Sequence, residues 1–223
     1  MLTSITIDPA VHALRPDAVV LALVATGLPG GPSDDGSRAA LAEATLSLPV
    51  TPPEEHPNVI AWREAYRAFG AKPQRTRCSV EALMRRGGLP EVNRLVDLYN
   101  VVSVRHVLPV GGEDLSRYRG AARLLRAEGT EPFEVLEAGV PAIDHPSPGE
   151  VVWCDDEGVT CRRWNWRQCV RTRITEDTTE ALFLLERLAP MTLDALREAG
   201  EDLTKRLRDL SPAVRIESRL IGA

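Results

Sequence analysis

Long apolar segments and targeting features are absent from this sequence. No window contains 18 consecutive apolar residues, and the first residues lack the basic stretch and the apolar stretch of a secretory signal. The 223 residues are 43% hydrophobic and 26% charged, so the chain can bury a core. Collagen, extended disorder and a bare coiled coil are excluded. We therefore expect one soluble globular domain over residues 1–223, located in the cytoplasm.

Cysteine and histidine are scarce, and their spacing does not indicate a metal site. The cysteines have no CxxC spacing, and a metal site would need at least two histidines to converge with a carboxylate or a thiolate. We therefore expect reduced thiols that mostly pack in the interior, no bound metal and no cofactor. The residues concerned are Cys78, Cys154, Cys161, Cys169, His12, His56, His106 and His145.

Lysine is almost missing from the basic residues. Of 27 basic side chains only Lys72 and Lys205 are lysines, and the other 25 are arginines. Arginine suits phosphate and stacked contacts, but a GC-rich coding sequence explains the imbalance equally well. The formal net charge of −5 argues against wholesale wrapping of nucleic acid. Composition alone therefore identifies no partner.

The signatures of several large enzyme classes are also missing. The chain has no GxSxG, no GxxxxGK[ST], no HExxH and no glycine triplet of a dinucleotide-binding fold. Any catalytic activity must therefore depend on a less familiar arrangement of residues.

Apolar periodicity and turn residues predict an α+β fold, with a mixed β-sheet layered with helices in a single domain. The apolar run over 18–25 is typical of a buried strand, and Trp62, Tyr66 and Phe69 form an aromatic stripe that usually packs in the core. The predicted strands cover 3–7, 18–25, 122–127, 133–136, 150–154, 159–163, 169–174 and 213–217. The predicted helices cover 37–47, 57–69, 79–86, 92–106, 178–188 and 192–210.

Three polar residues interrupt the apolar pattern of the helix predicted over 92–106. Asn93, Asp97 and Asn100 are spaced by four and three residues, which places them on one face of that helix. Buried amides and carboxylates without hydrogen-bond partners cost about 1–3 kcal/mol each, so something polar must meet this face. The partners are either a ligand or the backbone of neighbouring loops, and the sequence leaves both interpretations open.

The segment Arg162-Arg163-Trp164-Asn165-Trp166-Arg167 places half of the tryptophans between arginines, immediately after a predicted hairpin strand. Aromatic and guanidinium planes together can hold a nucleotide or an amino-acid side chain. The alternative is a sheet edge at which the tryptophans cover the core and the arginines extend over them.

Several motifs together resemble the B3/B4 module of the bacterial phenylalanyl-tRNA synthetase β subunit, and most closely the free-standing B3/4-domain proteins. The module's N-x-x-V-D-x-x-N…P pattern is matched by Asn93 to Asn100 with Pro109 following nine residues later. The remaining matches are Arg77 to Leu83, Gly149 to Val152 and Cys161 to Trp166. The resemblance covers about residues 55–210 and implies a three-layer sandwich, with residues 1–54 as an N-terminal extension packed on it.

The resemblance implies a trans-editing hydrolase that deacylates misacylated tRNA, with canavanyl-tRNA for arginine as one such substrate. The histidine that follows the motif proline by two positions in the synthetase is Gly111 here, which puts tyrosine-type editing in doubt. The partner implied is tRNA carrying a wrong amino acid, with no DNA and no membrane. Two alternatives stay open, a non-catalytic tRNA- or RNA-binding module and a small-molecule amino-acid binder or hydrolase. The oligomeric state is not indicated.

Site residues follow from the resemblance and from local charge. We expect Asn93, Asp97 and Asn100 to be catalytic, and Glu81, Trp164, Asn165 and Trp166 to bind the substrate. The tRNA-binding surface is expected to include Arg75, Arg77, Arg167, Arg171 and Arg173.

Overall fold

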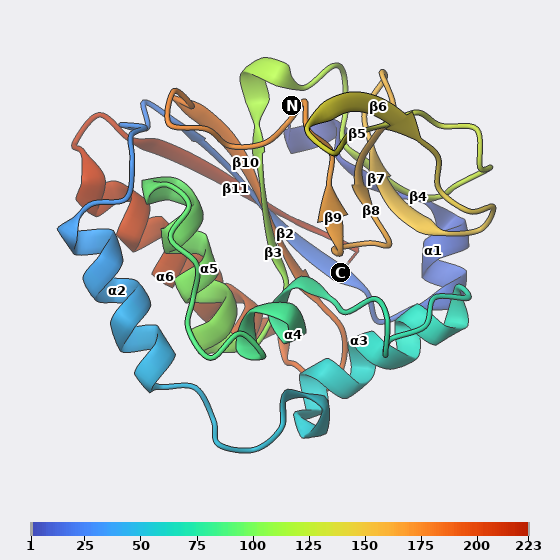
Figure 1. Ribbon diagram of the computed structural model, residues 1–223, viewed down its shortest axis with the longest axis horizontal. Helices are drawn as coiled ribbons and strands as arrows, with labels where there is room; N and C mark the ends of the chain where they lie inside the picture. The colour runs from blue at the N-terminus through green and yellow to red at the C-terminus, as the bar shows by residue number, and fades with distance from the viewer. Residues whose placement is uncertain (1, 223) are drawn as a thin grey trace.

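The computed structural model describes residues 2–222, and a four-stranded antiparallel sheet lies at its centre (Figure 1). The strand order is β11 (Arg215–Ile221), β2 (Val19–Thr26), β10 (Glu180–Arg187) and β3 (Val110–Asp114). β2 pairs with β10 over its whole length, from Val19↔Arg187 to Thr26↔Glu180. Both strands are apolar on both faces because both faces of this sheet are covered. The strand predicted over 18–25 is confirmed.

Helices cover one face of this sheet. α5 (Arg94–His106) and α6 (Leu193–Leu210) pack on it, and α2 (Asp35–Leu46) packs against α5, as the left half of Figure 1 shows. Leu21 and Phe183 from the sheet share one core cluster with Leu98 and Leu203 from the two helices. The helices begin where capping residues allow, for example at Asn93, whose side chain accepts a hydrogen bond from the backbone of Val96 at 3.0 Å.

A second sheet covers the opposite face and completes three layers. Its order is β1 (Thr6–Ile7), β4 (Arg123–Arg126), β7 (Val151–Cys154), β8 (Val159–Arg162) and β9 (Arg167–Gln168). β1 runs parallel to β4 and the other pairs are antiparallel, so this sheet is mixed. The two sheets and the helices confirm the predicted α+β class. The hairpin of β5 (Phe133–Glu137) and β6 (Val140–Asp144) lies beside the second sheet (Figure 1).

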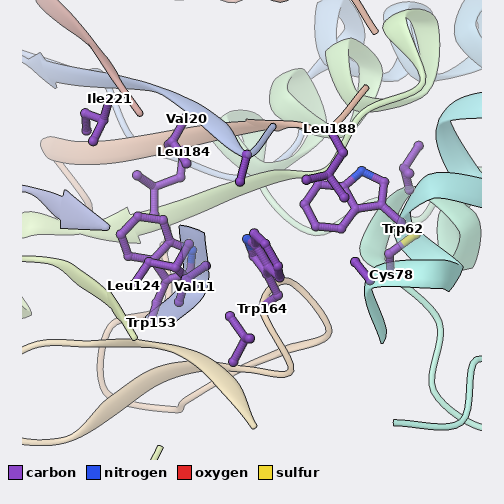
Figure 2. Packing of buried hydrophobic residues seen from close by; sticks show 14 of the residues in the cluster. Val11, Val20, Trp62, Cys78, Leu124, Trp153, Trp164, Leu184, Leu188 and Ile221 are labelled. Atoms are coloured by element: carbon purple, nitrogen blue, oxygen red, sulfur yellow. The ribbon is translucent and has the colours of Figure 1, made fainter. Parts of the chain in front are cut away.

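The core between the two sheets is rich in tryptophan. Figure 2 shows Trp164 between Trp153 and Trp62, and the rings of Trp62 and Trp164 meet edge to face at 5.1 Å. Trp62 and Tyr66 come from α3 (Pro57–Ala68), which confirms the aromatic stripe as core. The short helices α1 (Pro9–Leu14) and α4 (Ser79–Met84) and the 3-10 turns Leu2–Ser4, Pro53–Glu55 and Leu115–Arg117 complete the elements described.

Three expectations about the fold are wrong. The helix predicted over 178–188 is the central strand β10, because a short apolar run buried on both faces fits either a strand or a helix. The strand predicted over 169–174 is a series of turns with one isolated bridge at Arg173, and within it the Cys169 thiol and the Thr172 hydroxyl hydrogen-bond each other at 3.2 Å. The segment before residue 55 is no appendage, since it supplies β2 in the middle of the sheet.

No helix within residues 2–222 is long and apolar enough to cross a membrane. All four cysteines are free thiols, and Cys78, Cys154 and Cys169 are buried.

Candidate functional site

The first turn of α5 holds two of the expected catalytic residues in a structural setting. Asn93 caps the helix, and its side-chain amide donates a hydrogen bond to the carbonyl of Ile174 at 3.1 Å. Asp97 is fully buried and accepts hydrogen bonds at 2.9 Å from the Ser37 hydroxyl and from the backbone N–H of Val92. Both side chains therefore bind neighbouring segments of the protein, and neither lines the cavity that borders the next turn of α5.

The next turn of α5 has polar groups without partners. Asn100 is 7% exposed and Tyr99 is half-buried, and neither side chain forms a hydrogen bond within the described residues. The buried hydroxyl of Ser79, on α4, also lacks a partner in this part of the structure. Burial raises the pKa of Tyr99, which keeps the phenol protonated and available as a donor. Groups of this kind are normally satisfied, so their free capacity points to a ligand.

These three side chains line a cavity of about 250 Å³. It lies between α4, α5, the strands β3 and β10 of the central sheet, and the turn after β8. Its volume is below the 300–1,000 Å³ typical of pockets for drug-sized ligands, and it suits a group the size of an amino acid. The lining includes Ser79, Arg86, Tyr99, Asn100, Gly111, Glu113, Cys161, Trp166, Arg167 and Glu186.

Glu186, on β10, is a buried carboxyl held in a hydrogen-bond network. It is 2% exposed and accepts hydrogen bonds at 2.6 Å from the indole N–H of Trp153 and from the amide of Asn165. Asn165 in turn accepts a hydrogen bond from the Tyr66 hydroxyl at 2.9 Å. Burial raises the pKa of Glu186 to about 8, against the opposing effect of these hydrogen bonds. The carboxyl is therefore largely protonated at neutral pH.

Glu113, on β3, is the second buried carboxyl of the cavity. It is 3% exposed and accepts a hydrogen bond from the Gln168 amide at 2.6 Å. Burial raises its pKa to about 8 as well, and the negative charge of Asp155 adds to the shift, while hydrogen bonds from Thr172 and Gln168 oppose it. No cation forms an ion pair with Glu113 or Glu186 in residues 2–222. The cavity thus contains two acidic groups that only an incoming ligand could pair.

Gly111 widens the cavity. A Cβ atom at this position would meet no heavy atom within 4 Å, whereas one at Gly112 would come within 2.8 Å of the Tyr99 ring. The space that a side chain at position 111 would fill is therefore open. The histidine implied for this position by the synthetase motif would occupy that space.

The turn after β8 forms one wall of the cavity in a strained conformation. Arg163 and Trp164 both have positive φ angles, of 48° and 69°, which non-glycine residues rarely adopt. The strain directs Trp164 into the core and brings Asn165 to Glu186. Trp166 lines the cavity and carries the Arg163 guanidinium 4.3 Å from its ring centre. Trp164, Asn165 and Trp166 are thus all brought to the cavity.

Glu81 does not reach the cavity. It is fully buried below three arginines, with Arg63 at 2.7 Å, Arg85 at 3.1 Å and Arg77 at 3.6 Å from one carboxylate oxygen. Its negative charge is already compensated, so this residue holds α3 and α4 together. No contact with a substrate follows from its position.

The expected tRNA-binding arginines divide into free and engaged groups. Arg75, Arg167 and Arg173 are exposed, and no ion pair occupies their side chains within the part of the chain described. Arg77 is drawn toward Glu81, and Arg171 makes two hydrogen bonds of 2.8 Å to Asp155. Arg86, which the sequence did not single out, is exposed and lines the mouth of the cavity together with Arg167.

Besides Arg86, sequence reasoning missed Ser79, Tyr99, Glu113 and Glu186 among the side chains of this cavity. The sequence holds a weak signal for Glu186, because this carboxyl directly extends the apolar run 181–185, where another buried residue would be expected. Burial also raises the pKa of the Cys161 thiol well above its usual range, so this residue is not a thiolate nucleophile at neutral pH.

Across residues 2–222, no three His, Cys, Asp or Glu side chains are grouped so that they could hold a metal ion.

Comparisons with known proteins agree with the sequence motifs. The family model of the B3/4 domain matches residues 61–205. Among solved structures, the chain is similar to an N-terminal fragment of the phenylalanyl-tRNA synthetase beta-subunit from Pyrococcus horikoshii, with 13% identity and a TM-score of 0.48. The similarity covers 98% of this chain and 50% of the other, so the chain spans about half the length of that fragment. No curated protein sequence matches.

Proposed function

The chain belongs to the B3/4 domain family, and on this premise we propose that it is an editing hydrolase that removes wrong amino acids from tRNA in trans. The observation that carries the proposal is the amino-acid-sized cavity with two uncompensated buried carboxyls and three unpartnered polar groups. An aminoacyl ester presents a small side chain, an ester carbonyl and a polyanionic RNA strand. The cavity and its arginine-bordered mouth offer complementary groups for each.

Side-chain recognition is assigned to Glu113 and Glu186. Carboxylates bind guanidinium-type groups through charge-assisted hydrogen bonds, and such a site rejects an apolar side chain because its own polar atoms would stay unpaired. Both residues line the cavity, whereas Glu81, first expected to bind the substrate, and Asp97, first expected to be catalytic, do not line it. Canavanine, with an oxyguanidine of lower basicity than arginine, is the proposed amino acid. The discrimination would then depend on protonation at the two carboxyls.

Ester hydrolysis is assigned to the donors of α4 and α5. Asn100, Tyr99 and Ser79 can donate hydrogen bonds to the ester carbonyl, whose oxygen gains negative charge as water attacks. The ester bond then breaks, giving the free amino acid and the tRNA hydroxyl. An aminoacyl ester is already activated, so positioning of water and stabilisation of the oxyanion suffice without a covalent intermediate. Of the residues first expected to be catalytic, only Asn100 keeps this role.

The test is a deacylation screen against a panel of mischarged tRNAs. We expect canavanyl-tRNA for arginine to lose its amino acid fastest, arginyl-tRNA to be spared, and Glu113→Gln to slow the reaction. If no tRNA of the panel is hydrolysed faster than without protein, the proposal is wrong. Binding of tRNA without hydrolysis would then identify an RNA-binding module, and salt-independent turnover of a free amino-acid ester would identify a small-molecule hydrolase.

A further inference from the structure

Trp166 differs from the other tryptophans of the chain in its exposure. Trp62, Trp153 and Trp164 are at most 2% exposed and belong to the core, whereas Trp166 is half-buried at the wall of the cavity. A half-exposed indole beside a binding cavity is a large flat surface that the fold itself leaves uncovered. The packing of the core does not account for its position.

The Trp166 ring is held in place from one side. The guanidinium of Arg163 lies over the ring at 4.3 Å, and that guanidinium also donates a hydrogen bond to the hydroxyl of Thr76. The backbone N–H of Arg163 donates to Glu150 at 3.1 Å, which anchors the same turn. One face of the indole is thus stacked on a fixed cation, and the rest of the ring borders the cavity.

The charges around Trp166 favour an anionic partner. Arg86 and Arg167 line the same mouth, are exposed, and have no ion-pair partner within residues 2–222. Free arginines bind phosphates, and an indole stacks on a nucleobase. A planar aromatic surface flanked by free guanidinium groups therefore matches a nucleotide at the end of an RNA strand better than it matches an amino-acid side chain.

We propose that Trp166 is the stacking platform for the 3′-terminal base of the bound RNA, with Arg163 as the positioning residue that fixes the indole. The inference rests on the proposed function, since it places the last nucleotide of the tRNA at the mouth while the esterified amino acid enters the cavity. Arg86 and Arg167 then lie where the adjoining phosphates run. Stacking at this point orients the ester without contacting the reacting atoms.

Trp166 itself provides the measurement, because the other three tryptophans are buried. Tryptophan fluorescence is followed while an uncharged RNA hairpin ending in 3′-CCA is added, and the matched probe is the same hairpin without the terminal adenosine. We expect the complete hairpin to quench the fluorescence and to bind about 5- to 150-fold more tightly than the shortened one. Equal affinity of the two hairpins would overturn the proposal.

Variants separate stacking from simple charge. With a labelled hairpin, Trp166→Leu should weaken binding of the complete hairpin to the level of the shortened one, and Trp166→Phe should restore part of the difference. Arg163→Gln should reduce the difference while the protein stays folded, whereas Arg208→Gln, an exposed arginine on α6 away from the cavity, should leave it unchanged. Unchanged discrimination in Trp166→Leu would contradict the inference.

Failure here and failure of the proposed function give different results. If mischarged tRNA is hydrolysed and Trp166→Leu discriminates the two hairpins as the wild type does, the stacking site is wrong and the editing activity stands. If the fluorescence responds to the terminal adenosine but no ester is hydrolysed, the stacking site stands on a protein that only binds RNA.

Discussion

Two successive turns of α5 present the same kind of polar side chain and have opposite environments. In the first turn, the Asn93 side chain hydrogen-bonds with Ile174 and Val96, and the Asp97 side chain hydrogen-bonds with Ser37 and Val92. Asn100 in the next turn is almost as buried and has no partner within residues 2–222. Burial is therefore not what distinguishes a site residue from a structural one. The difference lies in whether the protein already supplies the hydrogen bonds.

The acidic residues repeat this contrast. Glu81 is surrounded by three arginines, while Glu113 and Glu186 are also buried and form no ion pair within residues 2–222. A compensated carboxylate stabilises the fold where it stands. A buried carboxyl without a cation stays protonated because ionisation would carry a desolvation cost, and a cationic ligand offsets that cost, which is the property expected of a recognition group.

The largest expected effect is on turnover, and it comes from changing Asn100, the polar residue in the second of the two turns of α5. Asn100→Ala removes a donor that no protein group uses, so we expect the turnover number for mischarged tRNA to fall by about 100-fold. The free energy of unfolding should change by less than about 0.5 kcal/mol. Single-turnover deacylation and urea unfolding of the same preparation measure both quantities.

Asp97→Ala is the matched variant for this comparison. It leaves the Val92 N–H without its side-chain acceptor and the Ser37 hydroxyl with only the Asp34 carbonyl, and we expect it to lower the free energy of unfolding by about 3 kcal/mol. In the protein that remains folded, the turnover number should stay near that of the wild type. A selective loss of turnover in Asp97→Ala, with stability intact, would reverse the assignment of the two turns.

The periodicity of the sequence was sufficient for most elements of the fold. The strand over 18–25 and the helix over 192–210 were recognisable because their apolar residues and caps agree with a single structure. β10 was not recognisable as a strand, because an apolar run of this length fits a buried helix equally well until its neighbours β2 and β3 are known. Pairing between residues about 67 to 168 positions apart, from Ala181↔Asp114 to Arg187↔Val19, is not encoded in local pattern.

The site was predictable in outline and not in its chemistry. The spacing of Asn93, Asp97 and Asn100 located the correct helix, and the tryptophan-arginine segment located the correct wall. Which of three polar residues lacks a partner depends on Ser37 and Ile174, which are distant in sequence. The two carboxyls come from strands whose adjacency creates the cavity, so no local signal connects them.

The second expected effect is on the pH dependence of stability. Glu113 and Glu186 have pKa values of about 8 in the folded protein, above the ordinary value of 4.5, so the folded state holds more protons than the unfolded state between these values. Their contribution to stability is therefore complete below about pH 4.5 and is lost as the pH rises through 8. Each group contributes a slope of at most about 1.4 kcal/mol per pH unit.

Glu113→Gln tests this effect while keeping an acceptor for Gln168. We expect the free energy of unfolding to fall less between pH 5 and pH 8 in the variant than in the wild type, as measured by urea unfolding at both values. Asp17, whose pKa is lowered to about 2 chiefly by its hydrogen bond with Arg15, acts in the opposite sense and only below about pH 4. An identical pH dependence in the two proteins would mean that Glu113 is ionised in the folded state.

The smallest expected effect distinguishes free from engaged arginines on the RNA-facing side. Arg167 has no ion-pair partner in the described residues, so Arg167→Gln should lower the slope of log affinity against log salt for tRNA by about 0.7 to 0.9. Arg171 is held by Asp155, Glu134 and Glu157, so Arg171→Gln should leave the slope unchanged and instead lower the unfolding temperature. Titrations at several salt concentrations, with thermal unfolding of both variants, give the two quantities. Because a phosphate can bind Arg171 only after breaking its two hydrogen bonds to buried Asp155, an equal loss of slope in both variants would show that the acidic residues around Arg171 release it when RNA binds.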